Sequence, residues 1–328
     1  MYYRTIELSD IKQIIGLWNI EAVNLGYKPF RDEQDFTQQV VRNKNFSRDG
    51  FIVCLSKNES VIGFINMVCK KEISTGETFQ DTPGYLNMLV VDSNYQKQGI
   101  GSTLLDLGEK YLKDNGKKEV TLSHSCPIKL SWYVDKEKHE HNKAPGIKKE
   151  SYGLKFLKKR GYAVQQEELS YYRNLKDFTL ADEVKIQAEN LEKEGITFTF
   201  FNQLRHSGYS EMFERLEDPS FYKKFIDGIQ EGKDILVAVD QTQVCATAGT
   251  IFREENGRGF FSALAVDPLY QGRHIGNVLF GKLCLALKEK QADYMTLFVT
   301  KDNHARRIYE RSGFKVVQEW SIMNKDLE

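Results

Sequence analysis

Two segments of the chain read almost alike: residues 86–101 are LNMLVVDSNYQKQGIG, and residues 261–276 are FSALAVDPLYQGRHIG. Matched positions stand 175 residues apart, and the match runs on without a gap from Leu104 over Leu279 to Leu122 over Leu297. Each segment puts an apolar, β-prone run before a glycine-containing loop, and then a run with helical spacing of apolar residues. We therefore predict a duplicated strand–loop–helix unit in two similar halves.

The rest of each half follows the same order of predicted elements. A short β-prone opening is followed by a helical region, a pair of strands, the repeated unit, another strand, a helix that ends at glycine and a last strand. The predicted strands are 3–8, 51–55, 61–69 and 119–122 in the first half, and 196–201, 235–239, 244–252 and 294–299 in the second. This order predicts an α/β fold in which each half has its own mixed sheet with helices on both faces.

The duplication predicts two domains, which agrees with the length of 328 residues. We expect an N-terminal domain at 1–176, a linker helix at 177–195 that ends at Gly195, and a C-terminal domain at 196–328. The first half holds extra residues between Leu122 and Gly161, at about 126–150, which include Trp132 and Tyr133. We predict that this insert is a loop or lid outside the repeat.

The composition excludes several classes of protein. Lys+Arg and Asp+Glu are both 46, and a chain without a basic excess is not expected to be a general nucleic-acid binder. No run reaches the length of a membrane span and no signal peptide follows Met1, so we expect a cytoplasmic protein with no membrane partner. The five cysteines lack metal-ligand spacing, and His139 and His141 stand in a lysine-rich run, so no metal site is expected.

The loop after each repeated strand is the candidate binding site. A loop that leads into a helix leaves backbone N–H groups without helical partners at the positive end of the helix dipole, and glycine lets a phosphate approach them closely. A pyrophosphate is the natural ligand of such a cradle. The patterns of a dinucleotide fingerprint and of a P-loop are both absent. The candidate residues are Gln96, Lys97, Gln98, Gly99, Ile100 and Gly101 in the first half, and Gln271, Gly272, Arg273, His274, Ile275 and Gly276 in the second.

Together with its strand, this loop resembles the Gln/Arg-x-x-Gly-x-Gly/Ala motif of the Gcn5-related N-acetyltransferase (GNAT) superfamily. The second half also resembles that superfamily's closing segment, on the residues Asn303, Ala305, Tyr309, Gly313 and Phe314. The resemblance covers nearly the whole chain as two tandem copies, a layout similar to that of mycothiol synthase. It implies two tandem acyl-CoA N-acyltransferase folds, each with a mixed, mostly antiparallel central sheet.

The resemblance implies acetyl-CoA as the cofactor and transfer of its acetyl group to a primary amine of a small molecule or peptide. The pyrophosphate would lie on Lys97–Ser102, with Ser102 added to the loop, or on Gly272–Asn277, with Asn277 added. The pantetheine arm would pair like a strand with the backbone of the preceding strand. The residues expected beside that arm are Leu89, Val90 and Val91 in the first half, or Leu264, Ala265 and Val266 in the second. Asn303 of the second half is also expected to bind the cofactor.

The two halves differ in the residues that the family uses for catalysis. A tyrosine in the last helix often gives a proton to the departing thiolate, and Tyr309, with Asn303 before it, matches that tyrosine. The first half has Leu157 at the corresponding position, but it keeps the complete loop, whereas the second half has His274 in place of glycine. We therefore predict catalysis in the second half, with the first half as a cofactor-binding or structural copy.

Other interpretations remain open at this point. Relatives often place a glutamate where Phe260, Phe261 and Ser262 stand, and the nearby Glu254, Glu255 and Asp302 are typical solvated charges, so the sequence names no general base. The alternatives are catalysis in the first half, a non-catalytic acyl-CoA-binding protein, and an interaction module that uses the insert around Trp132. Aromatic residues of the second half hint at a ring-bearing acceptor, although core packing explains them equally well: Tyr209, Phe213, Phe221 and Tyr222.

Overall fold

The computed structural model describes residues 1–73 and 77–327. Its contacts divide the chain into two compact units, one formed by Met1–Ser170 together with the segment from Gln318 onward, and the other by Tyr171–Val317. No helix in the described ranges is both long enough and apolar enough to cross a lipid bilayer.

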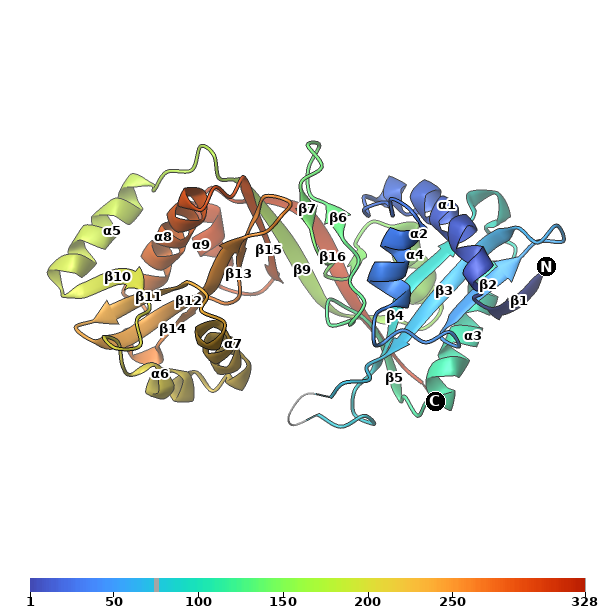
Figure 1. The fold of residues 1–328 in the computed structure, drawn as a ribbon, viewed down its shortest axis with the longest axis horizontal. Coiled ribbons are helices and arrows are strands. Elements are labelled where there is room, and N and C mark those ends of the chain that lie inside the picture. The colour runs from blue at the N-terminus through green and yellow to red at the C-terminus, as the bar shows by residue number, and fades with distance from the viewer. Residues whose placement is uncertain (74–76, 328) are drawn as a thin grey trace. The chain divides into compact units, whose positions relative to one another are not determined.

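The elements that begin in the first unit, and the last strand of the chain, are shown in Figure 1. The helices are α1 (Ile11–Glu21), α2 (Glu33–Phe36), α3 (Ile100–Asp114) and α4 (Tyr152–Lys159). The strands are β1 (Tyr2–Thr5), β2 (Phe51–Leu55), β3 (Val61–Cys69), β4 (Gly84–Val91), β5 (Glu119–Leu122), β6 (Trp132–Tyr133), β7 (Glu140–His141), β8 (Ile147–Lys148), β9 (Ala163–Asn174) and β16 (Lys315–Asp326).

The sheet of the first unit has the order β1-β2-β3-β4-β5-β16. All neighbours are antiparallel except β4 and β5, which are parallel. Successive side chains of β2 belong to different clusters, because Phe51, Val53 and Leu55 pack with α1 and α2, whereas Ile52 and Cys54 pack with α3 and α4. Helices therefore cover both faces of a mixed, mostly antiparallel sheet, as the sequence predicts (Figure 1).

The second unit repeats this plan with helices α5 (Asp182–Lys193), α6 (Tyr209–Leu216), α7 (Pro219–Gln230), α8 (Ile275–Glu289) and α9 (Arg306–Arg311). Its strands are β10 (Ile196–Phe200), β11 (Ile235–Asp240), β12 (Gln243–Arg253), β13 (Arg258–Phe261), β14 (Ala265–Val266) and β15 (Tyr294–Thr300). The pair β13 and β15 is parallel, and Gly259↔Met295 matches Gly84↔Val120 of the first unit at the offset of the sequence repeat.

The last strand of the chain differs from the expected division. From Gln318 onward β16 belongs to the first unit, where it pairs antiparallel with β5 from Met323↔Leu122 to Asp326↔Glu119. Trp320 in this strand is fully buried and donates a hydrogen bond to the Ser170 hydroxyl at 2.9 Å. The sequence assigned all residues after 195 to one domain because the pattern of a strand does not tell which sheet the strand joins. The boundary at 177–195 stays a prediction about where the halves separate.

The predicted linker helix is α5, and Gly195 follows it with φ +91°. One side of this helix is buried by Val184, Ala188 and Leu191, and the helix packs on α8 of the second unit. The segment is therefore an integral helix of that unit rather than an exposed tether.

The insert is ordered and belongs to the first unit. Its strands β6 and β7 form a hairpin, and β8 pairs with β16 through Trp320↔Lys148. The ring centroids of Trp132 and Trp320 lie 4.9 Å apart in an edge-to-face arrangement, and Trp132 is buried. The aromatic pair anchors the insert to the sheet.

Candidate functional site

A cavity of about 640 Å³ lies within the first unit. One part of its wall is formed by the glycine loop and the first turns of α3 and α4, through Lys97, Gly101 and Tyr152. Another part is formed by the end of α1 and the insert, through Tyr27 and Lys148. The central strand β4 runs along the cavity from Leu86 to Val91, so one space joins the loop to the insert.

The cavity exists because β4 and β5 separate. The two strands pair through Gly84↔Val120 and Tyr85↔Thr121. Among the described residues, β4 forms no further pairs with β5 after Tyr85. The next residues of β4 pair with β3 on the other side and keep one backbone edge toward the cavity. An extended ligand can pair with such an edge in the way that a strand would.

A bulge in β4 shapes the middle of this wall. The pairing with β3 shifts between Asn66 and Met67, which leaves Asn87 as the extra residue between Met88 and Leu86. The Asn87 amide donates hydrogen bonds to the Ile128 carbonyl at 2.8 Å and to the Cys126 sulfur at 3.3 Å. The bulge therefore fixes the loop after β5 against the cavity.

The two glycine loops share one backbone conformation. Lys97 and Gly99 have φ of +61° and +85°, and at the matched positions Gly272 and His274 have φ of +80° and +63°. Each loop thus has two residues in the left-handed conformation just before its helix. Glycine occupies the second of these positions in the first half and the first of them in the second half. His274 keeps the conformation that the family pattern assigns to glycine, so this departure does not change the path of the loop.

The side chains of the loops differ in their partners. Gln96 donates to the Val91 carbonyl at 3.0 Å, and Gln271 donates to the Val266 carbonyl at 3.4 Å, so both glutamines close their loops. Lys97 forms no ion pair among the described residues and lines the cavity, whereas Arg273 is paired with Glu194 at 2.6 Å. The first loop therefore offers a cation without a competing carboxylate.

The predicted binding residues of the first half mostly meet at the cavity. Its lining includes Leu89, Val90, Val91, Gln96, Lys97, Gly99, Gly101 and Ser102. Ile100 is instead a buried core residue at the start of α3, and the Gln98 amide donates a hydrogen bond to the Asn94 carbonyl at 3.4 Å. The matched residues of the second half lie at β14 and at the start of α8, in the other unit.

Tyr309 is a buried residue of the second unit. It is 7% exposed, and its ring centroid lies 5.0 Å from that of Phe280 and 5.8 Å from that of Tyr171. Burial raises the pKa of Tyr309 to about 12, so the phenol stays protonated at neutral pH. Asn303 precedes its helix, and its side-chain oxygen accepts a hydrogen bond from the Ala305 N–H at 2.8 Å.

Several cavity residues were not identified from the sequence. His124 follows β5, and burial together with the charges of Lys143 and Lys129 lowers its pKa to about 4, which keeps the imidazole neutral at pH 7. Tyr27 and Tyr152 supply phenols to the wall, and burial raises the pKa of Tyr27 to about 12. No local motif marks these residues, because the cavity brings them together from the segment after α1, the end of β5 and the start of α4.

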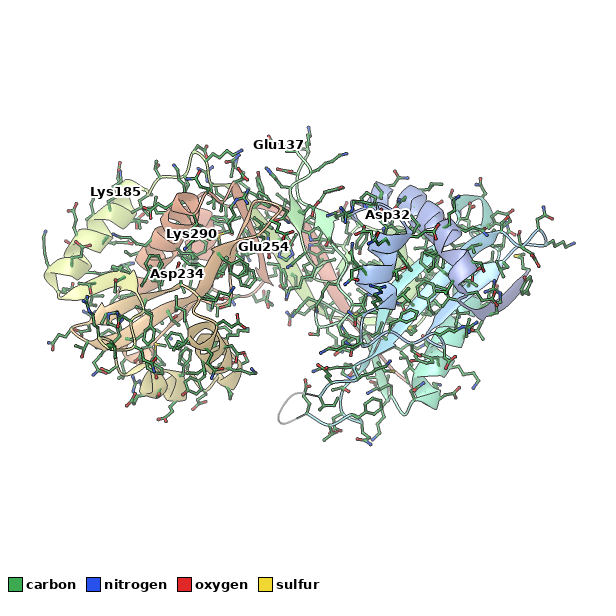
Figure 2. All side chains as sticks on the ribbon, in the orientation of Figure 1. Asp32, Glu137, Lys185, Asp234, Glu254 and Lys290 are labelled. Atoms are coloured by element: carbon green, nitrogen blue, oxygen red, sulfur yellow. The ribbon has the colours of Figure 1, made fainter. Side chains whose placement is uncertain are left out.

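Other residues that the sequence analysis considered for the site make structural contacts instead. Glu254 forms an ion pair with Arg258 at 2.7 Å, and Phe213 packs in the hydrophobic core of the second unit. The tip of the β6–β7 hairpin brings Asp135, Glu137 and His139 together, and Figure 2 shows Glu137 at the outer end of the hairpin. An acidic group of this kind is common without an ion.

These features fit the phosphate and pantetheine parts of acetyl-CoA. The first loop has two left-handed residues and a cation, and a Cβ added at Gly99 would meet nothing within 4 Å, so there is space in front of the loop. The exposed edge of β4 begins beside that loop and leads into the cavity.

Comparison with known proteins gives two family matches. Residues 17–127 match the "Acetyltransferase (GNAT) family" and residues 187–325 match the "Acetyltransferase (GNAT) domain". A curated relative, the [ribosomal protein bS18]-alanine N-acetyltransferase of Haemophilus influenzae, is 44% identical over 54 residues. That match spans 16% of this chain and 37% of the relative.

Solved structures with 11–16% identity share the fold over the whole chain. A GCN5-related N-acetyltransferase from Sphaerobacter thermophilus superposes with a TM-score of 0.66, at 16% identity, over 100% of this chain and 96% of that one. A tandem GNAT protein from the clavulanic acid biosynthesis pathway gives 0.58, at 11% identity, over 100% and 98%. A glucosamine N-acetyltransferase region of a fungal multi-domain enzyme gives 0.70, at 16% identity, over 99% of this chain and 38% of that one. The chain therefore belongs to the GNAT acetyltransferase family and carries one GNAT domain in each half.

Proposed function

We propose that the first unit is an N-acetyltransferase site, in which acetyl-CoA and a primary amine meet in the cavity along β4. The observation that carries the proposal is the continuity of this cavity, which joins the glycine loop, the free edge of β4 and the insert. The bound thioester supplies an activated acetyl group for direct attack by the amine.

The chain's own residues have definite tasks in this site. The N–H groups at the start of α3 and the Lys97 ammonium bind the pyrophosphate, and the edge of β4 holds the pantetheine arm. In the reaction a C–N bond forms, the C–S bond breaks, the thiolate takes a proton from an acid, and the amine proton leaves to water. Tyr152 is the candidate acid, because it lines the cavity at the first turn of α4, beside the start of α3.

The amine must be neutral to attack. The positive charges that lower the pKa of His124 also disfavour an ammonium ion nearby, so they increase the fraction of neutral amine. A neutral His124 can then accept a hydrogen bond from the amine instead of repelling it. The curated relative is an alanine N-acetyltransferase, which supports an amine as the acceptor.

Catalysis in the second half, with Tyr309 as the acid, is the second candidate. The observation that favours it is the position of Tyr309 in α9, the last helix of that half. Its low exposure and its packing between aromatic rings favour a structural role instead.

Paired tyrosine variants test the assignment. If the first unit is the active one, Tyr152→Phe should lower kcat by about 10²-fold or more with acetyl-CoA affinity nearly unchanged, because the phenol acts only as the C–S bond breaks. Tyr309→Phe should keep kcat within about twofold in the same assay of CoA release against a panel of amines. A large fall in kcat for Tyr309→Phe but not for Tyr152→Phe would assign catalysis to the second half. An unchanged kcat in both variants would indicate that water gives the proton to the thiolate.

A further inference from the structure

Lys148 holds its ammonium group against aromatic rings in the wall of the cavity. It lies on β8, opposite Trp320 of β16. Its Nζ lies 5.9 Å from the ring centroid of Trp132 and 5.7 Å from that of Trp320. A Cβ built on Gly26 would lie 2.8 Å from this Nζ, so the ammonium also lies against the segment that follows α1.

Lys148 has no anionic partner among the described residues, whereas lysines near it in the sequence and the fold do. Lys28 forms an ion pair with Glu140 at 2.8 Å, and Lys149 forms one with Glu319 at 2.9 Å. Among the described residues, the partners of the Lys148 ammonium are the two indole rings. Burial lowers the pKa of Lys148, which is the expected effect when an ammonium loses water without gaining a counter-ion.

The cavity wall contains further positive charge. Lys129 donates to the His124 carbonyl at 2.9 Å and to the Cys126 carbonyl, and burial lowers its pKa too. Glu21 is the only acidic side chain among the described residues that line the cavity, and its carboxylate already accepts a hydrogen bond from the Ser93 N–H at 2.8 Å. No carboxylate of the described cavity wall therefore compensates the charge of Lys148.

An uncompensated, partly dehydrated ammonium is costly, and a ligand anion removes that cost while forming a charge-assisted hydrogen bond. The CoA phosphates already have the cradle at Lys97 and the start of α3, whereas Lys148 lies beside Gly26 and the insert. The side chains of Trp18 and Tyr27 form an apolar and aromatic wall next to it.

We propose that the acceptor is an amine that also carries an anionic group, a carboxylate or a phosphate, and that this group binds at Lys148. The proposal rests on the proposed transferase site of the first unit. It gives the insert a function in substrate selection, because β8 carries Lys148 and β6 carries Trp132.

Matched pairs of acceptors test this inference. The pairs are L-phenylalanine with L-phenylalaninamide, and glucosamine 6-phosphate with glucosamine, at saturating acetyl-CoA. For each pair the ratio of kcat/KM, anionic over neutral, is measured in the wild type and in Lys148→Met, which keeps an unbranched apolar chain beside the indoles. The ratio should fall by about 10-fold in the variant, because a hydrogen bond to a charged group is lost. Where a pair is not turned over, dissociation constants are measured by calorimetry on the CoA-saturated protein.

Lys136→Met is the matched control, because Lys136 is an exposed lysine of the same insert. It should leave both ratios unchanged. The two pairs separate the possible anions, since a response of one pair alone identifies carboxylate or phosphate. The inference is overturned if the ratio survives in Lys148→Met, or if no pair member binds or reacts although acetyl-CoA binds in the first unit. Failure of acetyl-CoA to bind there would instead contradict the proposed function.

Discussion

Gly101 is the residue of the first loop where added bulk has the clearest expected effect. A Cβ at this position would lie 3.6 Å from Phe156 and 3.7 Å from Val91, which is ordinary contact distance, and both neighbours line the cavity. Alanine therefore fits, whereas a leucine side chain would extend into the space where the pantetheine arm is expected.

We expect Gly101→Leu to weaken acetyl-CoA binding by about 10-fold or more, since overpacking costs about 1–3 kcal/mol. Gly101→Ala should bind nearly as the wild type does, and Gly276→Leu, at the matched position of the second half, should leave the affinity of the first site unchanged. Calorimetric titration with acetyl-CoA measures all three. Equal affinity of Gly101→Leu and Gly101→Ala would contradict the placement of the cofactor.

His124 predicts a pH dependence of stability. Its pKa is about 4 in the folded protein and about 6.5 in an unfolded chain, so the unfolded state binds more protons between these values. The free energy of unfolding should therefore fall as the pH drops from 6.5 to 4, and this destabilisation by His124 is absent above pH 6.5. We expect a loss of about 2 kcal/mol, allowing for the part of the ring that water reaches.

The matched variant is His124→Asn, which removes the titrating group from the same position. Denaturant unfolding at several pH values between 7 and 4 should give a shallower decline for the variant than for the wild type. Parallel curves for the two proteins would show that the imidazole is not held neutral by its surroundings.

At the scale of elements, β16 completes the sheet of the first unit, and Trp320 fixes this strand in place. No local sequence pattern indicates this role of Trp320. Trp320 is fully buried and packs edge-to-face on Trp132. Trp320→Ala should destabilise the first unit by about 3–5 kcal/mol, as expected for removal of a buried indole. Val316→Ala is the control, because Val316 is 44% exposed and should change stability little. Urea unfolding, monitored through the loss of acetyl-CoA binding, would measure the stability of the first unit.

The sequence predicts the elements better than it predicts how they are combined. The strands 61–69 and 119–122 agree with β3 and β5, and Gly161 and Gly313 follow α4 and α9 with φ of +88° and +77°. These elements depend on local periodicity and on turn residues. The sheet that β16 joins depends on long-range pairing, and no local pattern carries that information.

The candidate site was predictable only in part, for the same reason. The loop from Gln96 to Ser102 is a local motif, and the structure places most of it at the cavity. Tyr309 matches a family motif, but its burial depends on Phe280 and Tyr171, which come from distant segments. The insert was identified as an extra segment, whereas its contribution of Lys148 to the cavity wall required the pairing of β8 with β16.

At the scale of the whole molecule, the units do not follow the order of the chain. Residues 175–181 connect β9 to α5, and a protease cut there breaks the covalent link between an N-terminal and a C-terminal fragment. The C-terminal fragment would still carry β16, which is a strand of the first unit. The nicked protein should therefore elute as one species in native size-exclusion chromatography and should separate only in denaturant. Separation under native conditions would contradict the strand assignment.

The place of β16 also has a consequence during synthesis. A ribosome makes the chain from the N-terminus, at about 5–20 residues per second, so β5 emerges long before the strand that pairs with it. Until translation reaches β16, the edge of β5 is open and Trp132 lacks its indole partner. The unit whose synthesis begins first therefore cannot complete its sheet until β16 has been made. A nascent chain stalled before Gln318 would expose this incomplete sheet to the chaperones of the cell.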